Sequence, residues 1–161
     1  MAKFLITPTT ESGRVITARL GANASNTRFT DADVGKGVKL TGDSQYNLLS
    51  AADAIEGVAN SVETGVYDGY VLGGIQTKGY IAATAYGLQA TPGTGALTVG
   101  QYVLAAAPAA VQVAETLSTT IRVVSATNQA TAAAAVYKAR VVSLGSAGTG
   151  AVGTAIVIEL L

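Results

Sequence analysis

The chain has 161 residues, of which 49% are apolar and only 12% are charged. Basic and acidic residues balance at 10 each, so no net charge draws the chain to nucleic acid or to an anionic membrane. Histidine and cysteine are both absent, which excludes a Ser-His-Asp triad, a thiolate nucleophile and the commonest zinc ligands. So few charged groups favour a protein that assembles with others.

The N-terminal segment, residues 1–30, combines a short apolar anchor with small polar residues. The anchor, Phe4, Leu5 and Ile6, is too short to be the hydrophobic core of a secretory signal, so we expect a protein made in the cytosol. We hypothesise that residues 1–30 form an extended arm that reaches a neighbouring protein and orders on binding, at a cost in entropy. The alternative is one or more ordinary edge strands of the β-domain that residues 31–161 form.

Short runs with a period of two dominate the rest of the chain, and they are separated by Gly, Thr, Asn and Ser. Such alternation is typical of half-buried strands joined by turns. The six runs are "RVITARL" (14–20), "KGVKLTG" (36–42), "GYVLGG" (69–74), "TIRVVSA" (120–126), "YKARVVSL" (137–144) and "TAIVIELL" (154–161). They predict an all-β fold, a small antiparallel sandwich or barrel of the jelly-roll kind.

Helix is scarce by the same test. In "SAADAIEG", Ser50 and Asp53 have the spacing of a capping box, and Gly57 would end a helix after about one turn. The alanine-rich "NQATAAAAVYKAR" has helical propensity but leads into an alternating run, so a strand entry is the alternative there. The longest uncharged stretch, residues 79–114, is broken by glycines and prolines and cannot be one membrane-spanning helix. We expect at most one short helical turn in a soluble chain.

Two segments of the chain resemble each other. "DVGKGVKLTGD" (33–43) and "TVGQYVLAAAP" (98–108) both contain Val-Gly, a polar residue and then an apolar strand. Two similar hairpin corners would explain this likeness, and a single pair of matches is too little to predict a duplicated domain.

Three motifs resemble ligand-binding loops. Asp31 and Asp33 could start a calcium loop, but its sixth and twelfth places, which need glycine and glutamate, hold Lys36 and Gly42. The "GKG" within this stretch lacks the Lys-Ser/Thr ending of a phosphate-binding loop. "GTGAVG" (148–153) has dinucleotide-binding spacing but precedes a β-branched run instead of a helix. We therefore predict no metal and no cofactor, with the acids at an exposed turn and the glycines in a loop.

Paired carboxylates are the remaining route to catalysis. The acids between residues 31 and 68 could supply an acid and a nucleophile for glycoside cleavage. The chain has no tryptophan and few aromatic residues to stack against a sugar. We predict that the protein is not an enzyme.

Tyrosine is the residue that most suggests a partner-binding surface. Its ring supplies apolar area while its hydroxyl remains hydrogen-bonded, and it is enriched at interfaces. Some of the 7 tyrosines would instead be core or strand-face residues. The predicted interface residues are Phe4, Leu5, Ile6, Tyr67, Tyr70, Tyr80 and Tyr86.

The order of features in residues 31–144 is also informative. "GKGVKLTGDSQYNLLSAADAIEGVANSVE" is followed by "DGYVLGGIQTKGYIAA", "GALTVGQYVLAAAPAAVQVA" and a closing pair of strands. This order of a strand, an Ala-Asp and Gly-Val step, a glycine-bracketed strand and a Val-Gly-x-x-Val hairpin resembles the head decoration, or capsid cement, proteins of tailed bacteriophages.

The resemblance implies a small β-barrel or sandwich on the outer surface of an icosahedral head, made in the cytoplasm of the bacterial host. It implies binding to the major capsid protein as a homotrimer or, alternatively, a homodimer, with no active site, no membrane and no direct nucleic acid contact. The competing interpretations are a tail-tube or head-fibre component of the virion, a receptor- or glycan-binding β-module, and a carboxylate-dependent glycosidase.

Overall fold

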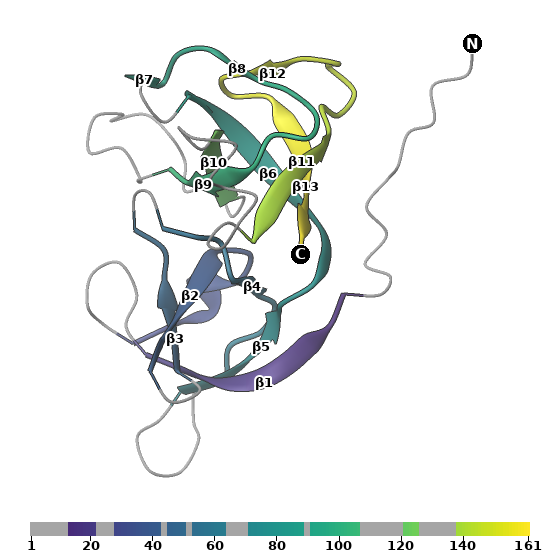
Figure 1. Cartoon of the computed structure of the whole chain (residues 1–161). Helices are drawn as coiled ribbons and strands as arrows, with labels where there is room; N and C mark the ends of the chain where they lie inside the picture. The colour runs from purple at the N-terminus through teal and green to yellow at the C-terminus, as the bar shows by residue number, and fades with distance from the viewer. Residues whose placement is uncertain are drawn as a thin grey trace.

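The computed structural model describes residues 13–21, 28–42, 45–50, 53–63, 71–88, 91–106, 121–125 and 138–161. Strands account for 58% and helix for 3%, and no helix reaches seven residues, which confirms the predicted all-β fold. Figure 1 shows strands β1–β5 gathered in one half of the molecule and β6–β13 in the other, with the C-terminus close to where the halves meet.

All six alternating runs correspond to strands. They are β1 (Val15–Leu20), β2 (Gly37–Gly42), β5 (Val71–Gln76), β10 (Ile121–Ser125), β11 (Ala139–Ser143) and β13 (Ala155–Leu160). Seven further strands are shorter or lack clean alternation. These are β3 (Gln45–Leu48), β4 (Gly57–Ala59), β6 (Gly79–Leu88), β7 (Thr91–Pro92), β8 (Ala96–Leu97), β9 (Val103–Ala105) and β12 (Gly150–Ala151).

Strands β1 to β5 form a closed barrel in the order β1-β3-β2-β4-β5, which we call the first ring. All neighbours are antiparallel except β1 and β3, which run parallel. Strand β1 therefore has a hydrogen-bonded neighbour on each side, and the predicted boundary between residues 30 and 31 falls inside this ring. Residues 1–12 of the hypothesised arm lie outside the described residues. The buried residues of this ring include Ala18, Leu20, Phe29, Val38, Ala59 and Ile75.

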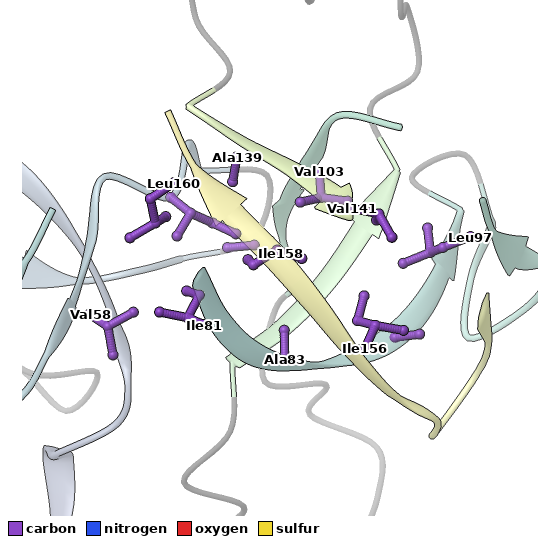
Figure 2. Close-up of a cluster of buried hydrophobic side chains, with 13 residues drawn as sticks. Val58, Ile81, Ala83, Leu97, Val103, Ala139, Val141, Ile156, Ile158 and Leu160 are labelled. Atoms are coloured by element: carbon purple, nitrogen blue, oxygen red, sulfur yellow. The ribbon is translucent and has the colours of Figure 1, made fainter. Parts of the chain in front are cut away.

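The second ring has the strand order β11-β13-β6-β10-β9. Its two outer strands meet through a bridge between Tyr102 and Arg140, and the N–H of Gly100 donates to the carbonyl of Val141 at 2.8 Å while that of Val141 donates to Gln101 at 2.8 Å. Strands β6 and β10 are parallel and the others antiparallel. Figure 2 shows the side chains that fill the interior, among them Ala83, Val103, Val141, Ile156 and Ile158.

The two rings repeat the same connectivity residue by residue. Strands β1, β2, β3, β4 and β5 correspond to β6, β9, β10, β11 and β13, and the parallel pair falls at the same place in each ring. The registers agree as well, because Ile16 pairs with Ile75 as Ile81 pairs with Ile158. Leu40 likewise pairs with Tyr46 as Ala105 pairs with Val123. The chain is thus built from two copies of one five-stranded ring.

The two similar sequence segments are equivalent corners of these rings, but the corner at Gly100 is not the predicted hairpin, because β8 pairs with β12 and β9 pairs with β10. Gly35 and Gly100 have φ values of 85° and 87°, in the left-handed region that glycine adopts without strain. The N–H of Gly35 donates to the carbonyl of Ala59 at 2.7 Å, and that of Ala59 donates to Lys36 at 3.0 Å. This is the arrangement that Gly100, Gln101 and Val141 make in the second ring, so the repeat extends well beyond the corners that the sequence indicated.

A short 3-10 helix covers Asp31–Asp33, a position that the sequence did not indicate. Residues 51–52 of the predicted turn lie outside the described residues; the Asp53 N–H donates to the Ser50 carbonyl at 3.2 Å, as in one turn of chain, and residues 53–56 are not helical. One of the two hydrogen bonds of the predicted capping box is present, because the Ser50 N–H donates to Asp53 Oδ2 at 2.6 Å. Most of the alanine-rich segment lies outside the described residues.

The "GTGAVG" segment is more ordered than the predicted loop. Gly150 and Ala151 form β12, which pairs with Leu97 and Ala96 of β8. A turn then leads into β13, so a strand follows the glycines, as the sequence indicated.

Candidate functional site: a row of aromatic and charged residues on the second ring

The predicted interface residues fall into two groups. Tyr80 and Tyr86 both lie on β6, where Tyr80 is 43% exposed and Tyr86 is half-buried. They are six residues apart on one strand, which separates them by about 20 Å. The remaining predicted residues lie outside the described residues: Phe4, Leu5, Ile6, Tyr67 and Tyr70.

Tyr80 belongs to a row of four side chains that crosses four neighbouring strands. It pairs with Glu159 of β13, Glu159 pairs with Arg140 of β11, and Arg140 pairs with Tyr102 before β9. Residues that flank the row along the strands, such as Ile81 and Ile158, are buried in the ring. Because side chains alternate between the faces of a strand, the four lie on the outer face. We call them the outer row.

An ion pair holds the centre of the outer row. Arg140 donates to Glu159 Oε2 from Nη2 at 2.7 Å and from Nε at 2.8 Å. The hydrogen bond and the charge of Glu159 raise the pKa of Arg140, which stays cationic throughout the physiological range. The row thus has a tyrosine side chain at each end and a neutralised charge pair between them. Tyrosine and arginine are the residue types that most often dominate protein–protein binding energy.

The equivalent row of the first ring is different in chemistry and in exposure. It consists of Val15, Gln76, Val58 and Gly37, paired in the same order. Val58 is buried and belongs to the apolar cluster of the second ring. In the first ring, Val58 therefore packs against the second ring, whereas its counterpart in the second ring, Arg140, is exposed.

Tyr80 is among the interface residues predicted from the sequence, whereas Tyr102, Arg140 and Glu159 are not. Alternation in "YKARVVSL" and "TAIVIELL" places Arg140 and Glu159 on the polar faces of their strands. Their contact with Tyr80 and Tyr102 depends on which strands are neighbours, and alternation carries no information on that.

Two further carboxylates, those of Asp53 and Glu56, also lie in ion pairs. Lys39 Nζ lies 2.6 Å from Asp53, and Lys138 Nζ lies 2.6 Å from Glu56. No group of three or more histidine, cysteine or acidic side chains within the described ranges could hold a metal ion. Asp33, Asp53, Glu56 and Glu159 are thus each paired with a cation.

Asp33 corrects one sequence expectation, because it is not at an exposed turn. It is 3% exposed, and its carboxylate accepts hydrogen bonds from Lys36 Nζ at 2.7 Å and from the Thr30 N–H at 2.9 Å. Burial raises the pKa of Asp33, but the hydrogen bond and charge of Lys36 and the hydrogen bonds from Thr30 outweigh burial, so the pKa is lowered. The lysine that disrupts the calcium motif in the sequence neutralises this acid in the fold.

The lowered pKa of Asp33 gives a pH-dependent prediction. A carboxylate with a depressed pKa stabilises the fold above its unfolded pKa, and this contribution is lost as the pH falls through the folded pKa. We expect Asp33→Asn to lower the free energy of unfolding by about 1–2 kcal/mol at pH 7, and the difference from the wild type to shrink below about pH 4. Urea denaturation across this pH range measures it. Asp31→Asn, at an exposed neighbour, is the control, and a pH-independent difference would contradict the interpretation.

Comparison with known proteins identifies no family, because no protein-family model and no curated protein matches the chain. Within the described residues, no helix is long and apolar enough to span a membrane.

Proposed function

We propose that the protein is a phage capsid decoration protein, which binds the outer surface of the icosahedral head as a symmetric oligomer and braces neighbouring major capsid subunits. The observation that carries this proposal is the outer row on the outer face of the second ring, in which Tyr80 and Arg140 are exposed and Glu159 and Tyr102 are half-buried, in a chain with few charges. It is suited to contact with another protein surface. The resemblance of residues 31–144 to decoration proteins supports the same function.

The mechanism is association through repeated modest contacts. Tyr80 and Tyr102 supply apolar area at low entropic cost, and the ion pair between Arg140 and Glu159 enters an interface without an uncompensated charge. An oligomer that binds several capsid subunits gains effective concentration at each contact after the first. Separating those subunits then requires several contacts to break together.

Co-sedimentation with undecorated heads of the phage that encodes the chain tests the function and the outer row together. We expect the wild-type protein to pellet with heads in a saturable manner. The double substitution Tyr80→Ala and Arg140→Ala removes one tyrosine side chain and the central cation of the outer row. We expect it to weaken binding at least about thirtyfold. The binding curve from pelleted and free protein is the measurement.

Val152→Ser is the control, because Val152 is also exposed, in the turn before β13, but lies outside the outer row. It is expected to bind like the wild type. If the double variant folds normally and also binds like the wild type, the outer row is not the interface. If the wild type does not pellet with heads at any concentration, the proposed function is wrong.

A further inference from the structure

A second surface feature lies at one end of the first ring, where residues of the second ring approach it. It is an open hollow of about 360 Å³, lined by apolar side chains, which we call the floor, and by charged side chains, which we call the rim. The apolar side chains are only partly covered, since Leu40 is 49% and Leu161 is 45% exposed. The lining residues are Arg14, Ile16, Leu40, Tyr46, Glu56, Thr77, Lys78, Lys138 and Leu161.

The rim of the hollow carries an excess of positive charge. Glu56 is neutralised by Lys138 at 2.6 Å and also accepts a hydrogen bond from the Leu40 N–H. Arg14 and Lys78 are exposed, and the described residues include no ion-pair partner for either. Two cations without an ion-pair partner among the described residues therefore line the hollow together with the partly exposed Leu40 and Leu161.

The equivalent end of the second ring is filled by other residues of the chain. Ile81, Ala105 and Leu160 are the equivalents of Ile16, Leu40 and Thr77, and they are buried in one cluster with Ile55 and Val58. Figure 2 shows Val58 beside Ile81. The Ala105 N–H donates to the carbonyl of Asp53 at 3.0 Å.

A chain segment that contains Asp53, Ile55 and Val58 thus closes the end of the second ring. It does so with apolar side chains and one main-chain hydrogen bond. At the equivalent position of the first ring, the N–H of Leu40 donates to the carboxylate of Glu56 instead. The end of the first ring has the same strand framework but remains a hollow rimmed by cations.

We propose that the hollow receives an acidic segment of the major capsid protein, with an apolar side chain on Ile16 and Leu40 and carboxylates beside Arg14 and Lys78. The inference rests on the proposed function and names the chemistry of the capsid segment. Opposite charges across an interface speed association and select the partner, and burying the apolar floor adds affinity.

Charge reversal in the same head-binding assay tests the proposal. Arg14→Glu with Lys78→Glu is expected to weaken binding about tenfold at low salt. The difference from the wild type should shrink between about 0.1 M and 1 M salt, because the Debye length falls from about 10 Å to about 3 Å. Leu40→Asp places a carboxylate on the floor and is expected to weaken binding in the same direction.

Arg19→Glu is the control, because Arg19 is an exposed cation on β1, the strand that follows Arg14, but does not line the hollow. Thermal unfolding shows whether each variant folds. If the double reversal folds and binds like Arg19→Glu, the hollow is not the acidic-segment site, while wild-type binding keeps the proposed function intact. If the wild type does not bind heads, both proposals are wrong. If the wild type self-associates without heads and the double reversal does not, the occupant is a second copy of the chain, which overturns the capsid segment.

Discussion

Replacing Ile158 by alanine is expected to lower the free energy of unfolding by about 3–4 kcal/mol. Ile158 lies at the centre of the second ring with no exposed surface, so the substitution removes buried apolar area and leaves a cavity that closed strands cannot collapse to fill. Ile75 is its equivalent in the first ring and is also fully buried. Ile75→Ala is therefore expected to cost a similar amount, and urea denaturation measures both.

Val99→Ala is the control for these core substitutions, because Val99 is 60% exposed in a turn. It should change the free energy of unfolding by less than about 0.5 kcal/mol. A large loss for one isoleucine and almost none for the other would contradict the equivalence of the two rings.

Gly87→Ala is expected to cost about 3–5 kcal/mol, a loss comparable to that of a buried isoleucine. Gly87 has a φ of +95°, and a Cβ there would lie 2.2 Å from the Thr94 carbonyl oxygen and 2.8 Å from its nitrogen. Both are backbone atoms, and that carbonyl already accepts the Leu88 N–H at 2.9 Å. The hairpin cannot move away without losing this bond, so the loss combines φ strain with a steric clash.

Gly93→Ala separates the two causes of this loss. Gly93 has a φ of +83°, but a Cβ there meets nothing within 4 Å, so only the conformational strain of about 1–2 kcal/mol applies. Thermal unfolding of the two variants compares them. Equal losses at the two glycines would show that the clash with Thr94 does not exist in solution.

Alternation predicted the strands in which one face is apolar and the other is not. In "TAIVIELL", Ile156, Ile158 and Leu160 point into the second ring while Glu159 points outward, as a period of two requires. Strand β6 is the longest and was not among the predicted runs. Its central residues, Ala82 to Ala85, are small on both faces, so the contrast on which the prediction depends is lost.

Neighbour relations between strands were beyond what the sequence could supply. Alternation fixes which face of a strand is buried, but it does not fix the partner strand or the register. Tyr80 and Glu159 are far apart in the sequence and adjacent in the fold, so the outer row emerges only after the ring closes. The hollow likewise depends on how the end of the first ring meets Lys138 and Leu161. The similar corners at Gly35 and Gly100 were the one visible sign of the repeat.

Because both rings lie on one polypeptide, their sequences can differ from each other. In a dimer of identical rings, every substitution occurs twice, and a residue suited to the contact between rings would also appear on the outside. Here Val58 serves the internal contact while its counterpart Arg140 faces solvent. Either face can therefore change in evolution or in an engineered variant without altering the other, which makes the outer row a position for grafting a new binding specificity onto an intact scaffold.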